Sequence, residues 1–93
     1  MAGPGYEVAD VFGANLARHR HKAGLSQEEL ADRASLHRTE ISPLETGIRL
    51  ARIDTVVKLA GALGVHPGDL FEGLVWEVAE PVTGRFRDDG ETR

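Results

Sequence analysis

The sequence has no cysteine, few aromatic residues and no long apolar segment. Without cysteine, disulfide bonds and thiolate chemistry are excluded. No stretch is long and apolar enough for a signal peptide or a membrane span, so we expect a cytoplasmic protein that does not associate with membranes. A glycine-rich phosphate loop and a nucleophile elbow are also missing, and we expect neither an enzyme nor a cofactor.

The histidines do not have the spacing of a metal site. His19 and His21 are two positions apart, which is about 200° around a helix axis, so the two rings cannot bind the same ion from a straight helix. No other group of ligating side chains has a suitable spacing. We therefore expect no metal.

The chain is acidic as a whole but not along its whole length. Its 93 residues suit one domain with a small core, and the net charge is −4. Residues 18–58 hold eight basic and six acidic side chains, whereas residues 59–93 hold three basic and seven acidic ones. A nucleic-acid-binding surface has to be basic only locally, so the middle segment remains compatible with one.

Hydrophobic periodicity predicts helices on both sides of the middle segment. Apolar residues four apart predict a helix over residues 6–23, which Gly24 ends. A second helix is expected from Ile53, and residues 67–71 predict a short fifth helix with proline in its first turn. The side chains that we expect to be buried by the helix from Ile53 are Ile53, Val56, Val57, Ala60 and Leu63.

Residues 26–47 have the pattern of two short helices joined by a tight turn. Ser26 can cap the first helix, and Glu29 at its third position completes a capping box. Residues 34–36 suit a three- to four-residue turn, so the two helices must cross steeply. In the second of these two short helices, Ile41 and Leu44 form the buried row, and Gly47 ends the helix. This is helix-turn-helix geometry.

The same segment resembles the helix-turn-helix of the lambdoid phage repressor and Cro class, known in bacterial chromosomes as the Xre family. The residues that carry the resemblance are Ser26, Gln27, Ala31, Leu36, Ile41, Glu45 and Gly47. Residues 54–65 are similar to the fourth helix of that family and its Ala-Leu-Gly-Val exit, and the resemblance covers roughly residues 11–72. It implies an all-α, five-helix DNA-binding domain that regulates transcription as a dimer.

The resemblance places the start of the second motif helix in the major groove. His37, Arg38 and Thr39 are then the candidates for base contacts, because the inner positions of this helix are taken by apolar residues and Glu45. Arginine can bind guanine with two hydrogen bonds, and threonine can offer a hydroxyl or a methyl group. The alternative is that these three residues are merely the exposed first turn of a helix.

Pro43 departs from the pattern. It lies on the groove-facing row with Thr39, where relatives often carry a long polar side chain. Proline removes a backbone hydrogen bond and disfavours α geometry at Ser42, so we expect a short or kinked recognition helix with an apolar ring near the bases. Glu40 is compatible with DNA if it caps the helix or accepts a hydrogen bond from cytosine.

Phosphate contacts are expected at the ends of the motif. Ser26 and Gln27 lie at a helix N-terminus, where free N–H groups favour an anion. The other candidates lie in or before the loop that follows the recognition helix, which in this family runs beside the DNA backbone: Thr46, Arg49 and Arg52.

Arg20 continues the apolar row of the first helix and therefore needs a partner of opposite charge. Glu45 falls in the same inner row as Ile41 and is the candidate, and in the repressors that the chain resembles the residues at these positions pair. Two unrelated surface charges are the alternative. We expect a structural ion pair that braces the first helix against the recognition helix.

The segment after residue 72 has a different pattern. Leu74, Trp76 and Val78 alternate with other residues, and a second run after Pro81 contains Phe86, so we expect a β-hairpin or strand pair followed by a polar tail over 88–93. Such a hairpin is marginal alone. We expect Leu74, Trp76, Val78 and Phe86 to form a homodimer interface, or else to fold back on the helices.

The sequence thus predicts three parts: a flexible tail over residues 1–5, a repressor-like domain over 6–72 and a C-terminal β extension over 73–93. We expect sequence-specific binding of a pseudo-palindromic double-stranded DNA operator by a homodimer, with repression as the outcome. The alternative is a protein-interaction module, such as an antitoxin, that binds a toxin through its C-terminal segment and DNA only weakly. The acidic face of residues 28–32 could also contact RNA polymerase, or could simply be a solvated helix face.

Overall fold

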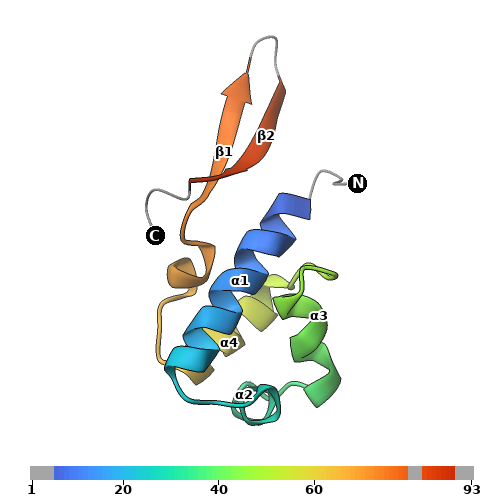
Figure 1. Ribbon diagram of the computed structural model, residues 1–93, viewed down its shortest axis with the longest axis vertical. Helices are drawn as coiled ribbons and strands as arrows, with labels where there is room; N and C mark the ends of the chain where they lie inside the picture. The colour runs from blue at the N-terminus through green and yellow to red at the C-terminus, as the bar shows by residue number, and fades with distance from the viewer. Residues whose placement is uncertain (1–5, 80–82, 90–93) are drawn as a thin grey trace.

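The computed structural model describes residues 6–79 and 83–89, which form a helical body followed by a β-hairpin (Figure 1). The elements in chain order are α1 Tyr6–Lys22, α2 Gln27–Arg33, the 3₁₀ helix η1 Arg38–Glu40, α3 Ile41–Glu45, α4 Ile53–Leu63, the 3₁₀ helix η2 Pro67–Phe71, β1 Leu74–Ala79 and β2 Thr83–Asp88. The predicted tail over residues 1–5 lies outside the described residues.

The predicted count of five helices is confirmed for the α-helices only in part. Within the described ranges four α-helices are present, and the expected fifth is the 3₁₀ helix η2. It spans only five residues, and the peptide N–H of Asp69 donates to the carbonyl of His66 three residues earlier. A segment so short favours this tighter winding. No helix in the described part of the chain is long and apolar enough to cross a membrane.

The core lies where α1, α2, α3, α4 and η2 meet. Each of these elements contributes a side chain that is completely or almost completely removed from solvent: Leu16, Leu30, Ile41, Leu59 and Leu70. In Figure 1, α2 lies below α1 and α3 lies beside it. One apolar cluster therefore fixes the position of every helix of the motif.

The predicted start of α4 at Ile53 is confirmed, but the prediction of its buried face was partly wrong. Val56 and Ala60 are buried as expected, but Ile53 is 86% exposed and Val57 is 55% exposed. The face turned to the core instead contains Thr55 and Leu59. The error arose because apolar character was equated with burial, whereas single exposed apolar residues are common on protein surfaces.

The first motif helix begins as its sequence predicts. The backbone N–H of Glu29 donates to Ser26 Oγ, and the N–H of Ser26 donates to Glu29 Oε1, so both halves of the capping box are formed. After α2 the chain turns through Ser35, which has a positive φ of 55°. This left-handed residue makes the steep change of direction toward η1.

β1 and β2 form an antiparallel hairpin that projects beyond the N-terminal end of α1 (Figure 1). Trp76 is paired with Phe86, and their rings meet edge to face with centroids 5.0 Å apart. A Cβ at Gly84 would lie 2.2 Å from the Trp76 indole, so only glycine lets the indole lie across β2. Asp88 belongs to β2 and not to the predicted polar tail, of which residues 90–93 lie outside the described part.

Candidate nucleic-acid interface

The recognition helix consists of two consecutive pieces, η1 and α3. Ile41 and Leu44 face the core, whereas His37, Arg38 and Thr39 are all exposed at its start. The structure thus brings the three candidate base-contacting residues together on one outward turn. The main chain there is wound as a 3₁₀ helix, which the sequence did not reveal.

His37 and Glu40 cap this first turn. His37 Nδ1 accepts a hydrogen bond from the backbone N–H of Thr39 at 3.2 Å, and the N–H of His37 donates to Glu40 Oε2 at 2.8 Å. With Nδ1 engaged in this cap, Nε2 is the ring nitrogen available for a base or a phosphate. Glu40 occupies the capping role that makes its charge compatible with DNA.

Arg38 is held only loosely. Its Nη1 lies 3.7 Å from Glu28 Oε2, and the two side chains are 72% and 65% exposed. An ion pair of this kind contributes little free energy, so the guanidinium can leave it for a stronger acceptor.

Pro43 lies within α3, which is only five residues long. Its ring is half-buried. Its carbonyl accepts hydrogen bonds from the N–H groups of Ile48 and Arg49 at 3.0 and 3.2 Å, which closes the helix into the following loop. The recognition helix is therefore short, in line with the effect expected of a proline at this position.

The structure brings Arg20 and Glu45 together between α1 and α3. Arg20 Nε and Nη2 donate to Glu45 Oε2 and Oε1 at 2.5 and 3.0 Å, and the side chains are only 11% and 7% exposed. Arg20 Nη1 also donates to the carbonyl of Leu25 at 2.9 Å. The hydrogen bond from the guanidinium to Glu45 raises the pKa of Arg20 above its ordinary value.

Two glycines let α1 and the end of the recognition helix approach closely: Gly13 at the backbone of α3, and Gly47, in the turn after α3, at the side chain of Asp10. The sequence analysis assigned no role to Gly13 and predicted Gly47 only as a helix stop. A Cβ at Gly13 would lie 2.4 Å from the carbonyl oxygen of Leu44, and one at Gly47, where φ is +78°, would lie 2.3 Å from Asp10 Oδ1. The signal was a glycine in the interior of a predicted helix, which indicates close packing. The end of the recognition helix is consequently locked to α1.

The predicted phosphate-contacting residues have different surroundings. Ser26 is used as a cap, the amide of Gln27 donates to Glu45 Oε1 at 3.0 Å, and Thr46 Oγ1 donates to the carbonyl of Ser42 at 2.9 Å. Gln27 therefore belongs also to the network around Arg20, a role that the sequence did not reveal. Its backbone N–H still lies in the first turn of α2.

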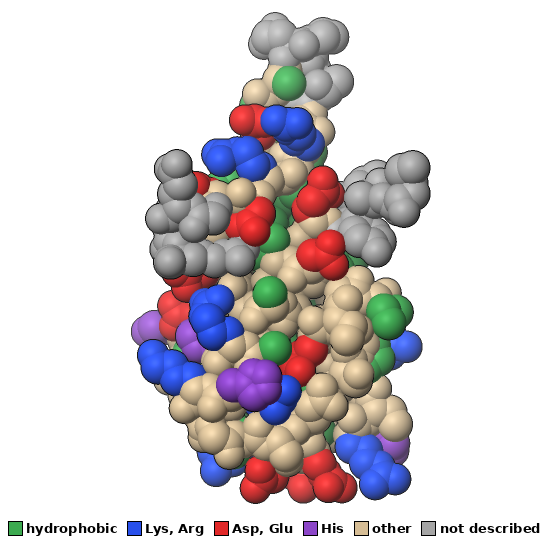
Figure 2. All heavy atoms as spheres, viewed as in Figure 1, with side chains coloured by type: hydrophobic (Ala, Val, Ile, Leu, Met, Phe, Trp, Pro, Cys, Tyr) green, Lys and Arg blue, Asp and Glu red, His purple; other side chains and the backbone are tan. Residues whose placement is uncertain are grey.

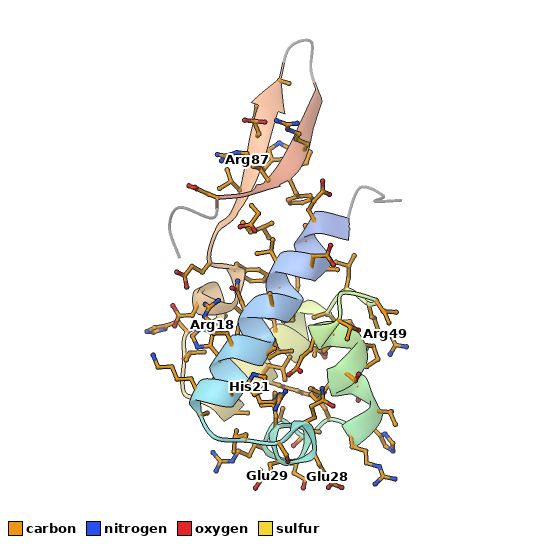
Figure 3. The ribbon with its side chains drawn as sticks, in the orientation of Figure 1. Arg18, His21, Glu28, Glu29, Arg49 and Arg87 are labelled. Carbon is orange, nitrogen blue, oxygen red and sulfur yellow. The ribbon has the colours of Figure 1, made fainter. Side chains whose placement is uncertain are left out.

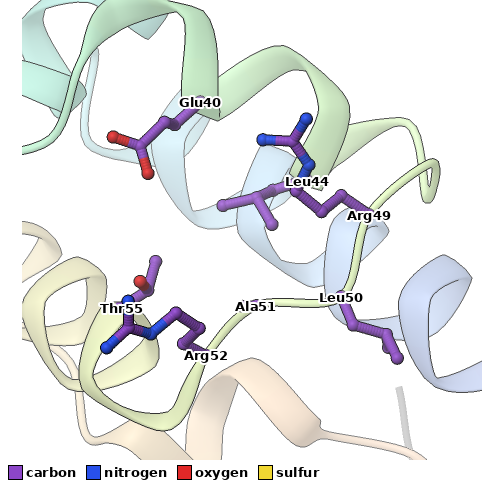
Figure 4. Close-up of a pocket in the computed structure, with 7 residues that line it drawn as sticks. All are labelled: Glu40, Leu44, Arg49, Leu50, Ala51, Arg52 and Thr55. Atoms are coloured by element: carbon purple, nitrogen blue, oxygen red, sulfur yellow. The ribbon is translucent and has the colours of Figure 1, made fainter.

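Arg49 and Arg52 lie on either side of one small hollow between the recognition helix and α4 (Figure 4). Its volume is about 130 Å³, and Glu40 and Thr55 also line it. Arg52 Nε lies 3.2 Å from Asp54 Oδ1, but both side chains are more than half exposed. Arg49 is exposed and has no ion-pair partner among residues 6–79 and 83–89.

Surface charge is mixed and does not gather into one patch on the face that Figure 2 shows. The acidic side chains of Glu28 and Glu29 lie at the end of the molecule formed by α2 (Figure 3). Within the described ranges no group of three or more ligating side chains could hold a metal ion.

Comparison with known proteins gives consistent matches over the helical body. A helix-turn-helix domain family matches residues 11–74. The control protein C.BamHI of Bacillus amyloliquefaciens is 43% identical over 63 residues, which are 67% of this chain and 78% of that protein. The control protein C.SmaI of Serratia marcescens is 35% identical over 57 residues, which are 61% of this chain and 68% of that protein.

A solved structure has the same fold. The crystal structure of the restriction-modification controller protein C.AhdI from Aeromonas hydrophila is 38% identical and superposes with a TM-score of 0.69 over 71% of this chain and 100% of that chain. The matched residues contain the motif, its capping box and the helices that hold it. The chain belongs to the Xre-like helix-turn-helix family of DNA-binding transcriptional regulators.

Proposed function

We propose that the protein binds a pseudo-palindromic operator in double-stranded DNA as a homodimer and represses transcription by occluding a promoter. One observation carries this proposal. His37, Arg38 and Thr39 form an exposed, capped turn at the start of a recognition helix, and the buried pair of Arg20 and Glu45 holds that helix on α1.

The three exposed side chains have complementary chemistry for base edges. The loosely held guanidinium of Arg38 suits the two acceptors of guanine in the major groove. Thr39 Oγ1 lies 2.8 Å from His37 Nδ1, so the hydroxyl and the ring are positioned together before DNA is bound. Pro43, one turn further along, offers an apolar ring that suits a thymine methyl group.

Phosphate contacts from both ends of the motif would fix this turn over the groove. The backbone N–H groups at the start of α2, beside Ser26 and Gln27, suit one phosphate. Thr46, Arg49 and Arg52 suit the DNA backbone on the other side of the recognition helix. Contacts of this kind set the position and orientation of the protein, whereas base contacts select the sequence.

The hairpin supplies the surface for the homodimer. Trp76 is 53% exposed and Val78 is 74% exposed, and Leu74 and Phe86 are half-buried beside them. A two-stranded hairpin with an open apolar face gains stability by pairing with a second copy. Twofold symmetry would then place two recognition helices about one DNA turn apart, roughly 34 Å.

The exposed apolar face also supports a second candidate. In that alternative, Trp76 and Val78 bind a different protein, such as a toxin, and the motif binds DNA weakly. The relatives that are named as control proteins favour the first candidate. The acidic residues of α2 are an additional surface for RNA polymerase if the protein activates some promoters.

Selection from fragmented genomic DNA tests the proposal directly. The purified protein is mixed with sheared DNA of its host, and the bound fragments are sequenced. We expect a shared motif with two inverted half-sites, located over a promoter. Recovery of random fragments, together with a monomer in sedimentation, would reject the homodimeric repressor in favour of the protein-interaction module.

Truncation after Gly73 separates the two uses of the hairpin. If the hairpin forms the homodimer, the shortened chain is a folded monomer with weak and site-insensitive binding. If it folds on its own helices or binds another protein, the shortened chain keeps the oligomeric state and operator affinity of the full chain.

A further inference from the structure

Asn15 is a completely buried polar residue in the middle of α1. Its Nδ2 donates two hydrogen bonds, to the carbonyl of Leu70 at 3.0 Å and to the carbonyl of Glu72 at 3.0 Å. These two carbonyls lie at the end of η2 and just before β1. Asn15 therefore attaches the start of the hairpin to α1, and neither DNA contact nor core packing accounts for its polar side chain.

Arg18 completes this connection one turn later on α1. Its Nη1 donates to Asn15 Oδ1 at 2.8 Å, and its Nη2 donates to Glu72 Oε1 at 3.1 Å. The two N–H bonds and the oxygen of the Asn15 side-chain amide are thus all hydrogen-bonded to protein partners. A fully satisfied buried network specifies one geometry, because any other arrangement leaves a buried group unpaired.

The hairpin begins just after Glu72, and its two strands are joined at their base. Gly73 has a φ of +87°, which turns the chain from η2 into β1. The N–H of Asp89 donates to the carbonyl of Gly73 at 2.5 Å, so the base of the hairpin is closed next to the residue that Asn15 holds. The direction of both strands therefore depends on the attachment at Glu72.

α1 also holds the recognition helix, through residues other than Asn15 and Arg18. Gly13 lets α1 contact the backbone of α3, and Arg20 pairs with Glu45. Figure 1 shows the hairpin and α3 on different sides of α1. One straight helix is thus the shared support of the DNA-contacting element and of the hairpin.

We propose that Asn15 is a positioning residue that sets the angle between the hairpin and the recognition helix and, through it, the half-site spacing that the dimer accepts. The inference rests on the proposed homodimer through the hairpin. Two half-sites strengthen binding only when one dimer reaches both of them, so a fixed angle selects one operator spacing and a loose one accepts several.

Spin labels test the angle without DNA and without reference to the dimer. The chain has no cysteine, so Ser42→Cys on α3 and Ala79→Cys at the end of β1 give two unique labels. Doubly labelled protein is diluted with unlabelled protein, and the distance distribution is measured by pulsed electron resonance. We expect one narrow distance distribution in the wild type. In Asn15→Ala the distribution should be at least twice as wide.

Two further variants serve as comparisons for this measurement. Arg18→Met removes the outer half of the network while leaving Asn15 in place, and it should broaden the distribution less. Glu77→Gln removes the ion pairs with Arg85 and Arg87 inside the hairpin, away from the attachment, and should leave the width unchanged. An unchanged width in both Asn15→Ala and Arg18→Met would overturn the positioning role.

Operators with one to three base pairs inserted between the half-sites provide the second measurement. We expect the wild type to prefer one spacing by at least about tenfold and Asn15→Ala to lose that preference while keeping its affinity for a single half-site. A preserved spacing preference in a broadened variant would overturn the link to operator spacing. A wild type that is monomeric would instead contradict the proposed homodimer, while the spin-label distances still decide the role of Asn15.

Discussion

The helical body and the hairpin differ in how far they bury their apolar side chains. The body, residues 6–72, encloses an apolar core in which Leu16, Leu30 and Leu59 are fully buried, and it leaves separate apolar side chains such as Ile53 exposed on its surface. The hairpin, residues 74–88, leaves Trp76 and Val78 more than half exposed. The body therefore has an apolar core of its own, whereas the hairpin, in the proposed function, buries its apolar face against a second copy.

The family match follows the same division. It ends at residue 74, where the hairpin begins. The matched part contains the motif and its supports, and the part beyond it contains the proposed dimer interface. In the proposed function, DNA binding and association are thus assigned to two consecutive segments, and substitutions in one segment should leave the fold of the other largely unchanged.

The largest expected effect is the loss of the buried ion pair in the body. Arg20→Met should lower the free energy of unfolding by about 3 to 5 kcal/mol, because it leaves Glu45 buried without its cation. Urea unfolding followed by circular dichroism measures the change. The matched variant in the hairpin, Arg85→Met, removes an ion pair whose arginine is 71% exposed and should cost about 1 kcal/mol or less.

A double-mutant cycle sharpens this comparison. Arg20→Met, Glu45→Met and the double variant should reveal a coupling energy, and additive effects would mean that the two residues do not interact. A hairpin variant as costly as Arg20→Met would contradict the idea that the body alone determines stability.

The second effect concerns association. Trp76→Ser should convert the dimer to a monomer and weaken operator binding by about a hundredfold, because the second half-site no longer assists the first. Sedimentation and gel-shift titration measure the two changes. The free energy of unfolding of the body, measured with urea, should change little, because the indole is 53% exposed in one subunit. A dimeric variant with wild-type affinity would show that the hairpin is not the interface.

The third effect is confined to the DNA-contacting turn. Arg38→Ala should weaken binding to the preferred operator by about 1 to 3 kcal/mol and relax the preference at one base pair. Competition binding with operators substituted at each position measures it. Arg33→Ala, an exposed arginine on α2, is the control. Equal weakening on all sequences would assign Arg38 to a phosphate.

The smallest effect depends on pH. The hydrogen bonds of the capping box, chiefly that from the backbone of Ser26, hold the pKa of Glu29 below its ordinary value. The ionised carboxylate therefore stabilises the fold above the ordinary glutamate pKa, and this contribution disappears as the pH falls through the lowered one. Near neutral pH, Glu29→Gln should unfold at a slightly lower urea concentration than the wild type. In acid the two proteins should unfold at the same urea concentration. Glu28→Gln serves as the control.

Much of the body could be predicted because its signals are local. The capping box at Ser26, the spacing of buried residues in α1 and the terminating Gly24 and Gly47 each depend on a few neighbouring residues. The alternation around Trp76 likewise predicted the strands, and the structure pairs it with Phe86. The family and its function as a DNA-binding regulator followed from the motif residues.

The failures share a different cause. The exposure of Ile53 and Val57 depends on which face of α4 meets the core, and both faces contain apolar residues. The hydrogen bond of Gln27 to Glu45 and the attachment by Asn15 join residues far apart in the chain. Sequence spacing cannot reveal such contacts, because it specifies a face of one helix and not the element opposite.

The capping of η1 by His37 has a consequence for how this protein can diverge. In the proposed function the ring that faces the DNA also holds the backbone of Thr39, and Glu40 holds the backbone of His37 in return. A replacement at position 37 that favours another base also removes a cap from the helix that presents it, unless Asn, Asp or Ser takes over the cap. Operator preference at this position should consequently change by coordinated substitutions within residues 37–40, so new specificities would arise in a few discrete steps.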